Sequence, residues 1–304
     1  DLVSSRGLGD VYKRQDRFDE KYDLVRSLRK GKYKYMRNYQ PFNVDGLYNF
    51  YRYKMLAYKE WYTLFQDGKL NDIQSQFFKP KSPESLYNIE EDPHETTNLA
   101  NDIAYNDILL TMREDLNNQL MSINDLSFLP EPYFLKSGID DVVKYSAQNK
   151  TLIKKLIETS NLQLKNYDEV SSQIKKALDH DNPWVRYWGL IVCSSFGSKA
   201  MENKDKINVI FENDSENLVR MRAAEFMLLN DIELSDSKIN SLLKRSNFEA
   251  EANLMLNTLA NIKTINPKYK LNLNKNVFPE NWIPPIREEN ALVNRRMNYL
   301  TENE

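Results

Sequence analysis

The residues of this chain that could carry out nucleophilic, acid–base or metal chemistry are few. There is one cysteine, Cys193, and there are two histidines, His94 and His180. Cys193 lies in the apolar run of residues 190–193, where a buried structural thiol is expected rather than a nucleophile. Each histidine lies in a polar loop and is expected at the surface. With so few cysteines and histidines, we expect no zinc site of the Cys/His type.

A charged cluster at residues 16–20 (DRFDE) directly precedes a segment with the alternation of a β-strand. Charged side chains at the entrance of a strand can line a cleft, but they are as often simply exposed. A set of aromatic residues follows: Tyr48, Phe50, Tyr51, Tyr53, Tyr58, Trp61 and Tyr62. These rings could stack on sugars, although packing within a loop-rich segment is the better expectation for most of them.

The overall composition excludes several classes of protein. The chain has 304 residues, with 42 Lys and Arg against 44 Asp and Glu, and a formal net charge of −2. That balance gives no general attraction to nucleic acid or to an anionic membrane, and we expect neither partner. No run approaches the ~18 uninterrupted apolar residues of a membrane helix. A single cysteine cannot form an intramolecular disulfide, and the length suggests two domains.

Residues 1–15 (DLVSSRGLGDVYKRQ) differ in style from the rest of the chain. They contain two of the eight glycines and no asparagine, whereas the rest is rich in Asn, Lys, Ile and Tyr. The segment has neither the period of a strand nor that of a helix, and it lacks the third glycine of a phosphate loop. It resembles the translated adapter strings found at the ends of assembled reading frames. We therefore expect a non-native segment, with the true chain beginning mid-domain near Asp16.

The pattern becomes that of a β-hairpin after this segment. Residues 23–28 and 33–39 alternate on either side of a polar turn that contains a glycine. In the second strand the tyrosines and Arg37 fall on one face, and Lys34, Met36 and Asn38 fall on the other.

A small α+β domain is completed by two further elements. A short strand is expected over residues 86–89 and an amphipathic helix over residues 105–123. Prolines at positions 130 and 132 break the helical register, so we place the end of this first domain at residue 136. The sequence therefore predicts an antiparallel sheet packed with a helix over residues 16–136.

Residues 137–265 lose the strand signal and predict an all-α region. Helical windows are expected at about 139–147, 150–160, 167–179, 183–196, 204–212, 216–230, 235–245 and 247–262. Residues 183–190 (PWVRYWGL) align with residues 217–224 (NLVRMRAA) at an offset of 34. Both segments open a helix with Val-Arg after an acidic or Asn-rich loop. This resembles HEAT/armadillo-like repeats, in which short helices bury their apolar faces by stacking.

The last segment, residues 266–304, predicts an extended tail. It is rich in Pro, Asn and Lys, and Phe278, Trp282 and Ile283 are expected to pack on the end of the helical region. A terminal helix through residues 291–293 is also expected.

Two motifs of the first domain resemble type I sulfatases of the alkaline-phosphatase-like superfamily. The strand YKYMRNY at residues 33–39 is similar to the RYKYIRNY strand near the C-terminus of that family. The segment ESLYNIEEDPHETTNLA at residues 84–100 is similar to the family's ELYDLENDPxExxNLA, with Asn88 where Asp is usual. The two motifs have the family's order and spacing, and the helix over 105–123 follows them. The resemblance covers residues 16–136, and an appended HEAT-like region would account for the rest.

The resemblance implies a fold and an activity for an intact parent protein. In that family the catalytic groups lie upstream, in a large α/β domain with a formylglycine made from a C/S-x-P-x-R motif and a calcium ion. This chain contains no C/S-x-P-x-R. No catalytic or metal residue can therefore be carried onto it, and we expect the fragment to be inactive alone. The parent is implied to hydrolyse sulfate esters of carbohydrates in the periplasm or outside the cell.

Three charged residues are the candidates for a role toward the substrate. The family's strand entrance lies near the cleft, which implies that Arg17, Asp19 and Glu20 could contribute an outer wall and pair with sulfate or sugar hydroxyls. A second hypothesis is a non-enzymatic interaction module whose helical repeats bind a protein partner. An exposed apolar sheet over residues 16–39 would favour truncation, and a closed polar sheet would favour the module.

Overall fold

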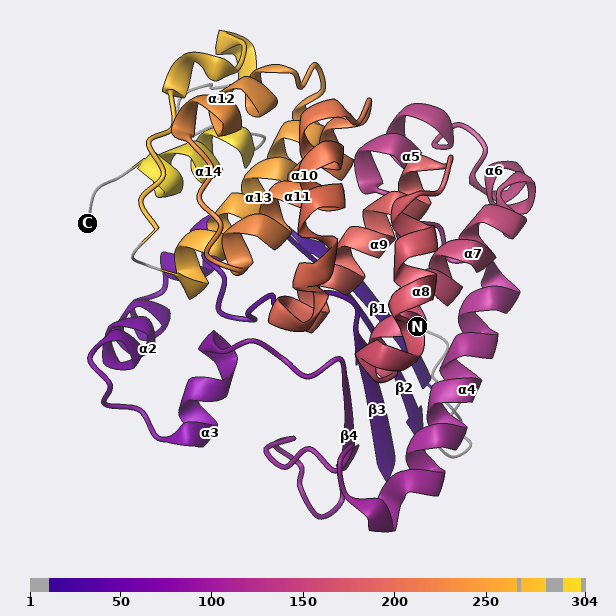
Figure 1. Ribbon diagram of the computed structural model, residues 1–304. Helices are drawn as coiled ribbons and strands as arrows, with labels where there is room; N and C mark the ends of the chain where they lie inside the picture. The colour runs from indigo at the N-terminus through magenta and orange to yellow at the C-terminus, as the bar shows by residue number, and fades with distance from the viewer. Residues whose placement is uncertain (1–10, 267–268, 283–291, 302–304) are drawn as a thin grey trace.

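The computed structural model describes residues 11–266, 269–282 and 292–301 of the chain. The N-terminal part, up to residue 123, contains β1 (Val11–Phe18), β2 (Lys21–Lys30), β3 (Tyr33–Asn38), α1 (Phe50–Tyr53), α2 (Leu56–Gln66), α3 (Asp72–Ser75), β4 (Glu84–Asn88) and α4 (Asn106–Ile123). The part that follows contains α5 (Glu131–Ser137), α6 (Val142–Gln148), α7 (Lys150–Ser160), α8 (Tyr167–Leu178), α9 (Pro183–Phe196), α10 (Lys204–Asn213), α11 (Asn217–Leu229), α12 (Asp236–Lys244), α13 (Glu249–Ile265) and α14 (Leu292–Thr301). A sheet followed by helices confirms the predicted α+β class (Figure 1).

The sheet has four antiparallel strands in the order β1-β2-β3-β4. The predicted hairpin is β2 and β3, which pair Arg26 with Arg37, and β4 joins its free side by pairing Leu86 with Tyr35. Strand β1 was not predicted, and its first five residues fall inside the segment set aside as non-native. It is an edge strand of highly charged composition, VYKRQDRF, and charged residues are common at exposed edges. This composition explains why no alternation of apolar residues marked it.

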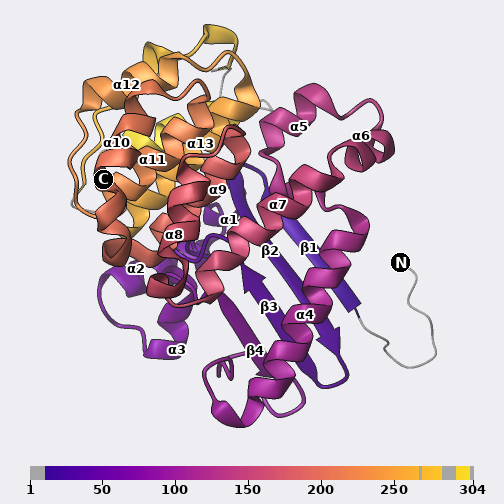
Figure 2. The same cartoon turned by 45° about the vertical axis from the view of Figure 1, so that its right-hand side comes forward.

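Alternation places different chemistry on the two faces of the sheet. Leu24, Tyr35 and Leu86 are buried, and α4 packs on β2 and β3 on this face (Figure 2). Helix α13 also contacts β2. The opposite face carries Lys34, Met36 and Asn38, as predicted, and borders a large cavity. An exposed apolar sheet was expected for a truncated sulfatase, and a closed polar sheet for an interaction module. This face is neither, because half-buried Val25 and Met36 lie among polar side chains.

Two buried arginines attach the sheet to the helices above it. Arg26 is fully buried and donates from Nε to Asp125 Oδ2 at 2.7 Å, and it also pairs with Asp16. Arg37 instead donates hydrogen bonds to main-chain carbonyls, including one from an Nη to Ser160 O at 3.1 Å. Ser160 is the last residue of α7, so Arg37 places a cation at the negative end of that helix dipole.

The helical region forms two layers. The bounds of α6 to α13 lie close to those of the helical windows predicted from the sequence. Helices α7, α9, α11 and α13 pack on one another in succession, and α8 and α10 pack outside α9 and α11 (Figure 1). Side chains link successive units: Arg186 pairs with Asp214, and Asn217 donates to Glu251 at 3.1 Å. The HEAT-like nature of these units stays a prediction.

Helix α5 was not predicted from the sequence. Pro130 and Pro132 were expected to interrupt the helical register, and they also begin α5, with Pro130 as its N-cap and Pro132 in its first turn. Proline suits this position because the first helical N–H groups have no partner within the helix.

A single cluster of buried apolar side chains runs through the sheet and the helical region. Trp188 of α9 lies in this cluster and donates from Nε1 to Phe128 O at 2.8 Å, across the predicted boundary. Cys193 is completely buried, as expected, and burial raises the pKa of its thiol to about 12. In the tail Phe278 is buried and Trp282 packs against the core, whereas Ile283 lies outside the described residues.

The predicted terminal helix is α14, which packs on α13. Among the helices that the structure describes, none combines the length and the apolar character needed to cross a bilayer.

Candidate functional site

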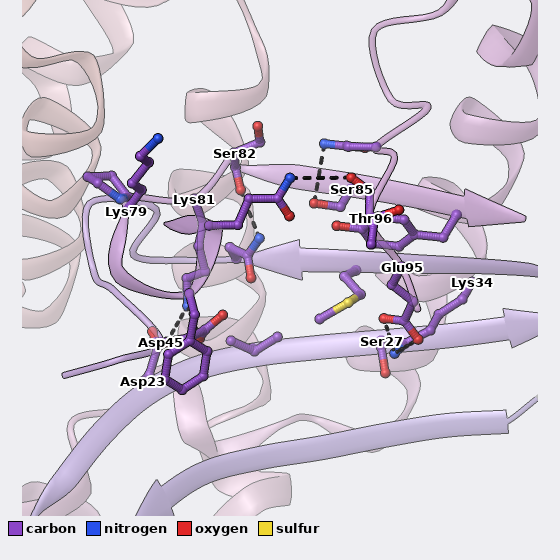
Figure 3. A pocket seen from close by; sticks show the side chains of 18 of the residues that line it. Asp23, Ser27, Lys34, Asp45, Lys79, Lys81, Ser82, Ser85, Glu95 and Thr96 are labelled. Atoms are coloured by element: carbon purple, nitrogen blue, oxygen red, sulfur yellow. Dashed lines mark hydrogen bonds and ion pairs between the residues drawn. The ribbon is translucent and has the colours of Figure 1, made fainter. Parts of the chain in front are cut away.

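A cavity of about 1110 Å³ lies against the open face of the sheet. Its floor is made by alternate residues of β2, β3 and β4, and its walls come from α2, from the loop around Lys81 and from the loop after β4. Figure 3 shows that charged side chains gather at its two ends, with Lys81 toward Asp23 and Asp45 at one end and Lys34 toward Glu95 at the other.

The ion pairs at the two ends differ in depth. Lys34 Nζ lies 2.6 Å from Glu95 Oε1, and both side chains are partly exposed. At the other end Lys81 Nζ pairs with Asp23 and lies 3.2 Å from Asp45 Oδ1. Burial alone would lower the pKa of the Lys81 ammonium, but the two aspartates outweigh this effect and raise it. Lys81 is therefore held charged beside Asp23, which belongs to the floor of the cavity.

A chain of buried polar contacts runs from this floor into the helical region. Asn43 donates to Asp23 at 3.1 Å and to Gln40 Oε1 at 3.0 Å. The same Gln40 oxygen accepts from Arg222 of α11 at 3.2 Å, and Arg222 is paired with buried Glu225. The position of Asp23 is thus set in part by residues of the helical region.

Aromatic rings form one wall of the cavity. Trp61 of α2 stacks on Phe77, with ring centroids 4.6 Å apart and planes inclined by 18°. Trp61 also donates from Nε1 to Gln74 O at 3.2 Å, which fixes the ring against α3. Of the aromatic set singled out in the sequence, Trp61 is the member that lines the cavity.

The second sulfatase-like motif forms the rim beyond β4. Asn98 Oδ1 accepts from Leu86 N and Ala100 N, each at 3.0 Å, and so holds the returning loop against the edge strand. Asp92 accepts from Thr97 N at 2.8 Å, and this hydrogen bond closes the turn over residues 92–97. The motif residues Asp92 and Asn98 therefore act in shaping the rim, and His94 between them is exposed on the cavity wall, in agreement with its expected surface position.

The three predicted substrate-binding residues have different surroundings. Arg17 lines the cavity, but its guanidinium is paired with Glu131 of α5. Asp19 occupies the turn between β1 and β2 with φ of 50° and is not among the lining residues. Glu20 is fully buried and accepts from Phe50 N, where it stabilises the start of α1. Their contact with substrate stays a prediction.

Most charged residues of the site were not predicted as site residues. Among them are Lys21, Asp45, Arg52 and Lys81, which come from several segments of the chain. Only Lys21 adjoins the charged cluster that the sequence singled out. Asp45 and Lys81 lie in segments rich in turn residues and Arg52 lies between two tyrosines, and no spacing pattern indicates that the three side chains meet.

The described residues do not suit the groups that the resemblance implies for the parent. Among residues 11–266, 269–282 and 292–301, no three His, Cys, Asp or Glu side chains are grouped so that they could hold a metal ion. No C/S-x-P-x-R segment is present in the sequence to provide a formylglycine. No reaction step through either group can be assigned to these residues.

Comparison with known proteins finds a relative among the sulfatases. The chain is 37% identical over 122 residues to an ulvan-active sulfatase of Formosa agariphila. The match covers 40% of this chain and 20% of that sulfatase. No family model matches the chain. The chain is therefore related to a sulfatase over part of its length, as the two motifs predicted.

Proposed function

We propose that this chain is the C-terminal portion of a sulfatase that acts on sulfated carbohydrate. In this proposal the open-face cavity is a wall of the substrate cleft, and the formylglycine and calcium ion belong to a catalytic domain elsewhere in the parent. The relative's described activity toward ulvan suggests a polysaccharide as the class of substrate.

The observation that carries the proposal is the pairing of aromatic rings with cations in one cavity. The stacked rings of Trp61 and Phe77 give one wall of the cavity an apolar character, and four lysines and two arginines line the same cavity. Sugar rings present apolar C–H faces that pack on such rings, and their sulfate groups attract cations. At about 1110 Å³ the cavity has room for more than one sugar unit.

The helical region has a bracing role in this proposal. Its helices share one core with the sheet, and Gln40, Arg222 and Asp23 belong to one chain of contacts. A free-standing interaction module would need a surface independent of the sheet, and the buried contacts favour the bracing role over that alternative.

Two measurements on the purified chain test the proposal. We expect no sulfate release from an aryl sulfate in the presence of calcium, because the catalytic groups are absent from the chain. We expect sulfated ulvan oligosaccharides to bind in titration calorimetry, and Trp61→Ala to weaken binding about three- to tenfold through the lost stacking surface.

The matched control is Tyr51→Ala, which removes an aromatic ring that is 55% exposed and does not line the cavity. Its affinity should equal that of the unchanged chain. Sulfate release by the chain would overturn the claim of missing chemistry, and absence of any oligosaccharide binding would overturn the assignment of the cleft wall.

A further inference from the structure

We propose that Lys21 and Arg52 form a subsite within the cavity for an anionic group of the saccharide, either a sulfate ester or a carboxylate. The inference rests on the proposed function, because it takes the cavity to be the saccharide site. Beyond the proposed function, the inference specifies which part of the cavity binds the anionic group and which two residues bind it.

The two cations converge on one main-chain oxygen. Lys21 Nζ donates to Asp45 O at 3.0 Å, and an Nη of Arg52 donates to the same oxygen at 2.7 Å. An ammonium has three donors and a guanidinium five, so each side chain keeps donors beyond this contact. A ligand oxygen beside Asp45 O could therefore accept from both side chains.

Carboxylates do not balance the charge at this corner. Lys81 pairs with both Asp23 and Asp45, whereas Lys21 reaches only Asp45 Oδ1, at 3.8 Å. Among the residues that the structure describes, three cations, with Arg52 included, thus face two carboxylates, which leaves one positive charge in excess.

The other charged groups around the cavity have partners of their own. Lys34 pairs with Glu95, and Lys79 pairs with Asp72. Asp16 pairs with Arg26, and Arg17 pairs with Glu131. The excess is therefore local to the corner rather than spread over the cavity.

Both cations are preorganised for binding, because the Arg52 side chain is held in place and the Lys21 ammonium is already largely desolvated. The Arg52 guanidinium lies over the rings of Phe18, Tyr58 and Phe77, at 5.6, 5.4 and 5.3 Å from their centroids, so little side-chain entropy is lost on binding. The Lys21 side chain is only 10% exposed. Burial lowers the pKa of Lys21 despite the opposing fields of two aspartates, as expected for an ammonium that has lost water without gaining a full partner.

The corner also adjoins the surface on which a sugar ring would stack. Phe77 contacts the Arg52 guanidinium and is stacked on Trp61, so a single ring joins the two features. A sugar packed on the Trp61 and Phe77 wall would bring a charged substituent within reach of the corner.

The test compares binding of three probes to the unchanged chain, to two cavity variants and to one control variant. The probes are oligosaccharides of equal length: dextran sulfate, oligogalacturonate and neutral dextran. Lys21→Met and Arg52→Gln each remove a cation, and Lys59→Gln is the control, since Lys59 is an exposed cation on α2 outside the cavity. Thermal melting checks that each variant is folded.

We expect each cavity variant to weaken binding of an anionic probe about tenfold or more, the effect of one charged hydrogen bond, with neutral dextran and Lys59→Gln unaffected. The anionic probe with the larger loss identifies sulfate or carboxylate as the group bound.

If dextran sulfate binds equally to the chain and both folded variants, the subsite is refuted while the cleft wall stands. The subsite is also refuted if neutral dextran shows the same loss as the anionic probes. If none of the three probes and no ulvan oligosaccharide binds, the proposed function fails with it.

Discussion

Helix α13 carries three buried asparagines spaced one turn apart, and they provide a sharp test of how the sheet is held. Asn257 Oδ1 accepts from Tyr22 N at 3.0 Å, and its Nδ2 donates to Tyr22 O at 3.1 Å. Asn257 Oδ1 also accepts from Arg296 at 2.9 Å. The side chain thus satisfies both main-chain groups of Tyr22, much as a neighbouring strand would.

Replacing Asn257 by alanine removes three hydrogen bonds and leaves the buried main chain of Tyr22 without a partner. Each buried group left unsatisfied costs about 1–3 kcal/mol. We expect Asn257→Ala to lower the free energy of unfolding by about 2–4 kcal/mol.

Asn253, one turn earlier on the same helix, is the matched control. It is 1% exposed, and neither atom of its amide has a hydrogen-bond partner among the described residues. Asn253→Ala loses the same atoms and gains the same helix propensity as Asn257→Ala, so these contributions cancel in the comparison. We expect Asn253→Ala to leave the free energy of unfolding nearly unchanged. Removing a buried amide that has no hydrogen-bond partner is favourable, and this gain offsets the packing that is lost.

Urea unfolding of the two variants, followed by circular dichroism, measures the difference. Hydrogen exchange then localises it: the Tyr22 amide should exchange faster in Asn257→Ala and unchanged in Asn253→Ala. Equal destabilisation by the two substitutions would refute the claim that the hydrogen bonds, rather than bulk packing, hold β2 to α13.

Three further predictions concern other parts of the molecule. Asn98→Ala should cost about 1–3 kcal/mol and speed proteolysis of the loop after β4, because Leu86 N loses its partner. Arg222→Met should cost about 3–5 kcal/mol by leaving Glu225 buried without its cation, and Arg222→Met with Glu225→Leu should recover much of the loss. The Cys193 thiol keeps its proton up to a pKa of about 12 in the folded chain but ionises near 9 when unfolded. Stability should therefore fall as pH rises from 9 to 12, with a smaller slope in Cys193→Ala.

Each of these three predictions has its own contradicting outcome. Unchanged proteolysis of Asn98→Ala would show that the rim holds without this side chain. A double variant no more stable than Arg222→Met alone would mean that the loss is not due to an uncompensated carboxylate. Equal pH slopes for the two chains, or rapid labelling of the native Cys193 thiol by a disulfide reagent at pH 8, would contradict its burial.

Local patterns predicted much of the secondary structure. Alternation identified β2 and β3 and assigned Lys34 and Arg37 to opposite faces, since the period of two fixes the face once the strand is known. Helix α7 was expected at residues 150–160 and lies there, because its apolar stripe is regular. Strand β1 was missed because a charged edge strand has no such stripe.

The candidate site could be predicted only in part. Trp61 stood in the aromatic set, but nothing in the sequence distinguished it from its neighbours. Lys21 of β2 and Lys81 each lie close to Asp45, and the three residues come from different segments of the chain. Their proximity depends on the tertiary structure and not on their spacing along the sequence. Glu20, predicted to contribute to the cleft wall, accepts from Phe50 N at the start of α1, and the sequence did not indicate this contact. Its contact with substrate stays a prediction.

The contacts of Asn257 and Arg296 also constrain when the sheet can be completed during synthesis. The partner of Tyr22 lies 235 residues later in the chain, and Arg296 donates to Tyr48 O across a separation of 248 residues. Contacts between such distant residues slow folding, because long loops must close before the contacts form. The first strands leave the ribosome early but stay without these partners until α13 and α14 follow. Through that interval the strands have unpaired groups open to misassociation, so we expect chaperone dependence to be greatest for chains stalled before residue 257.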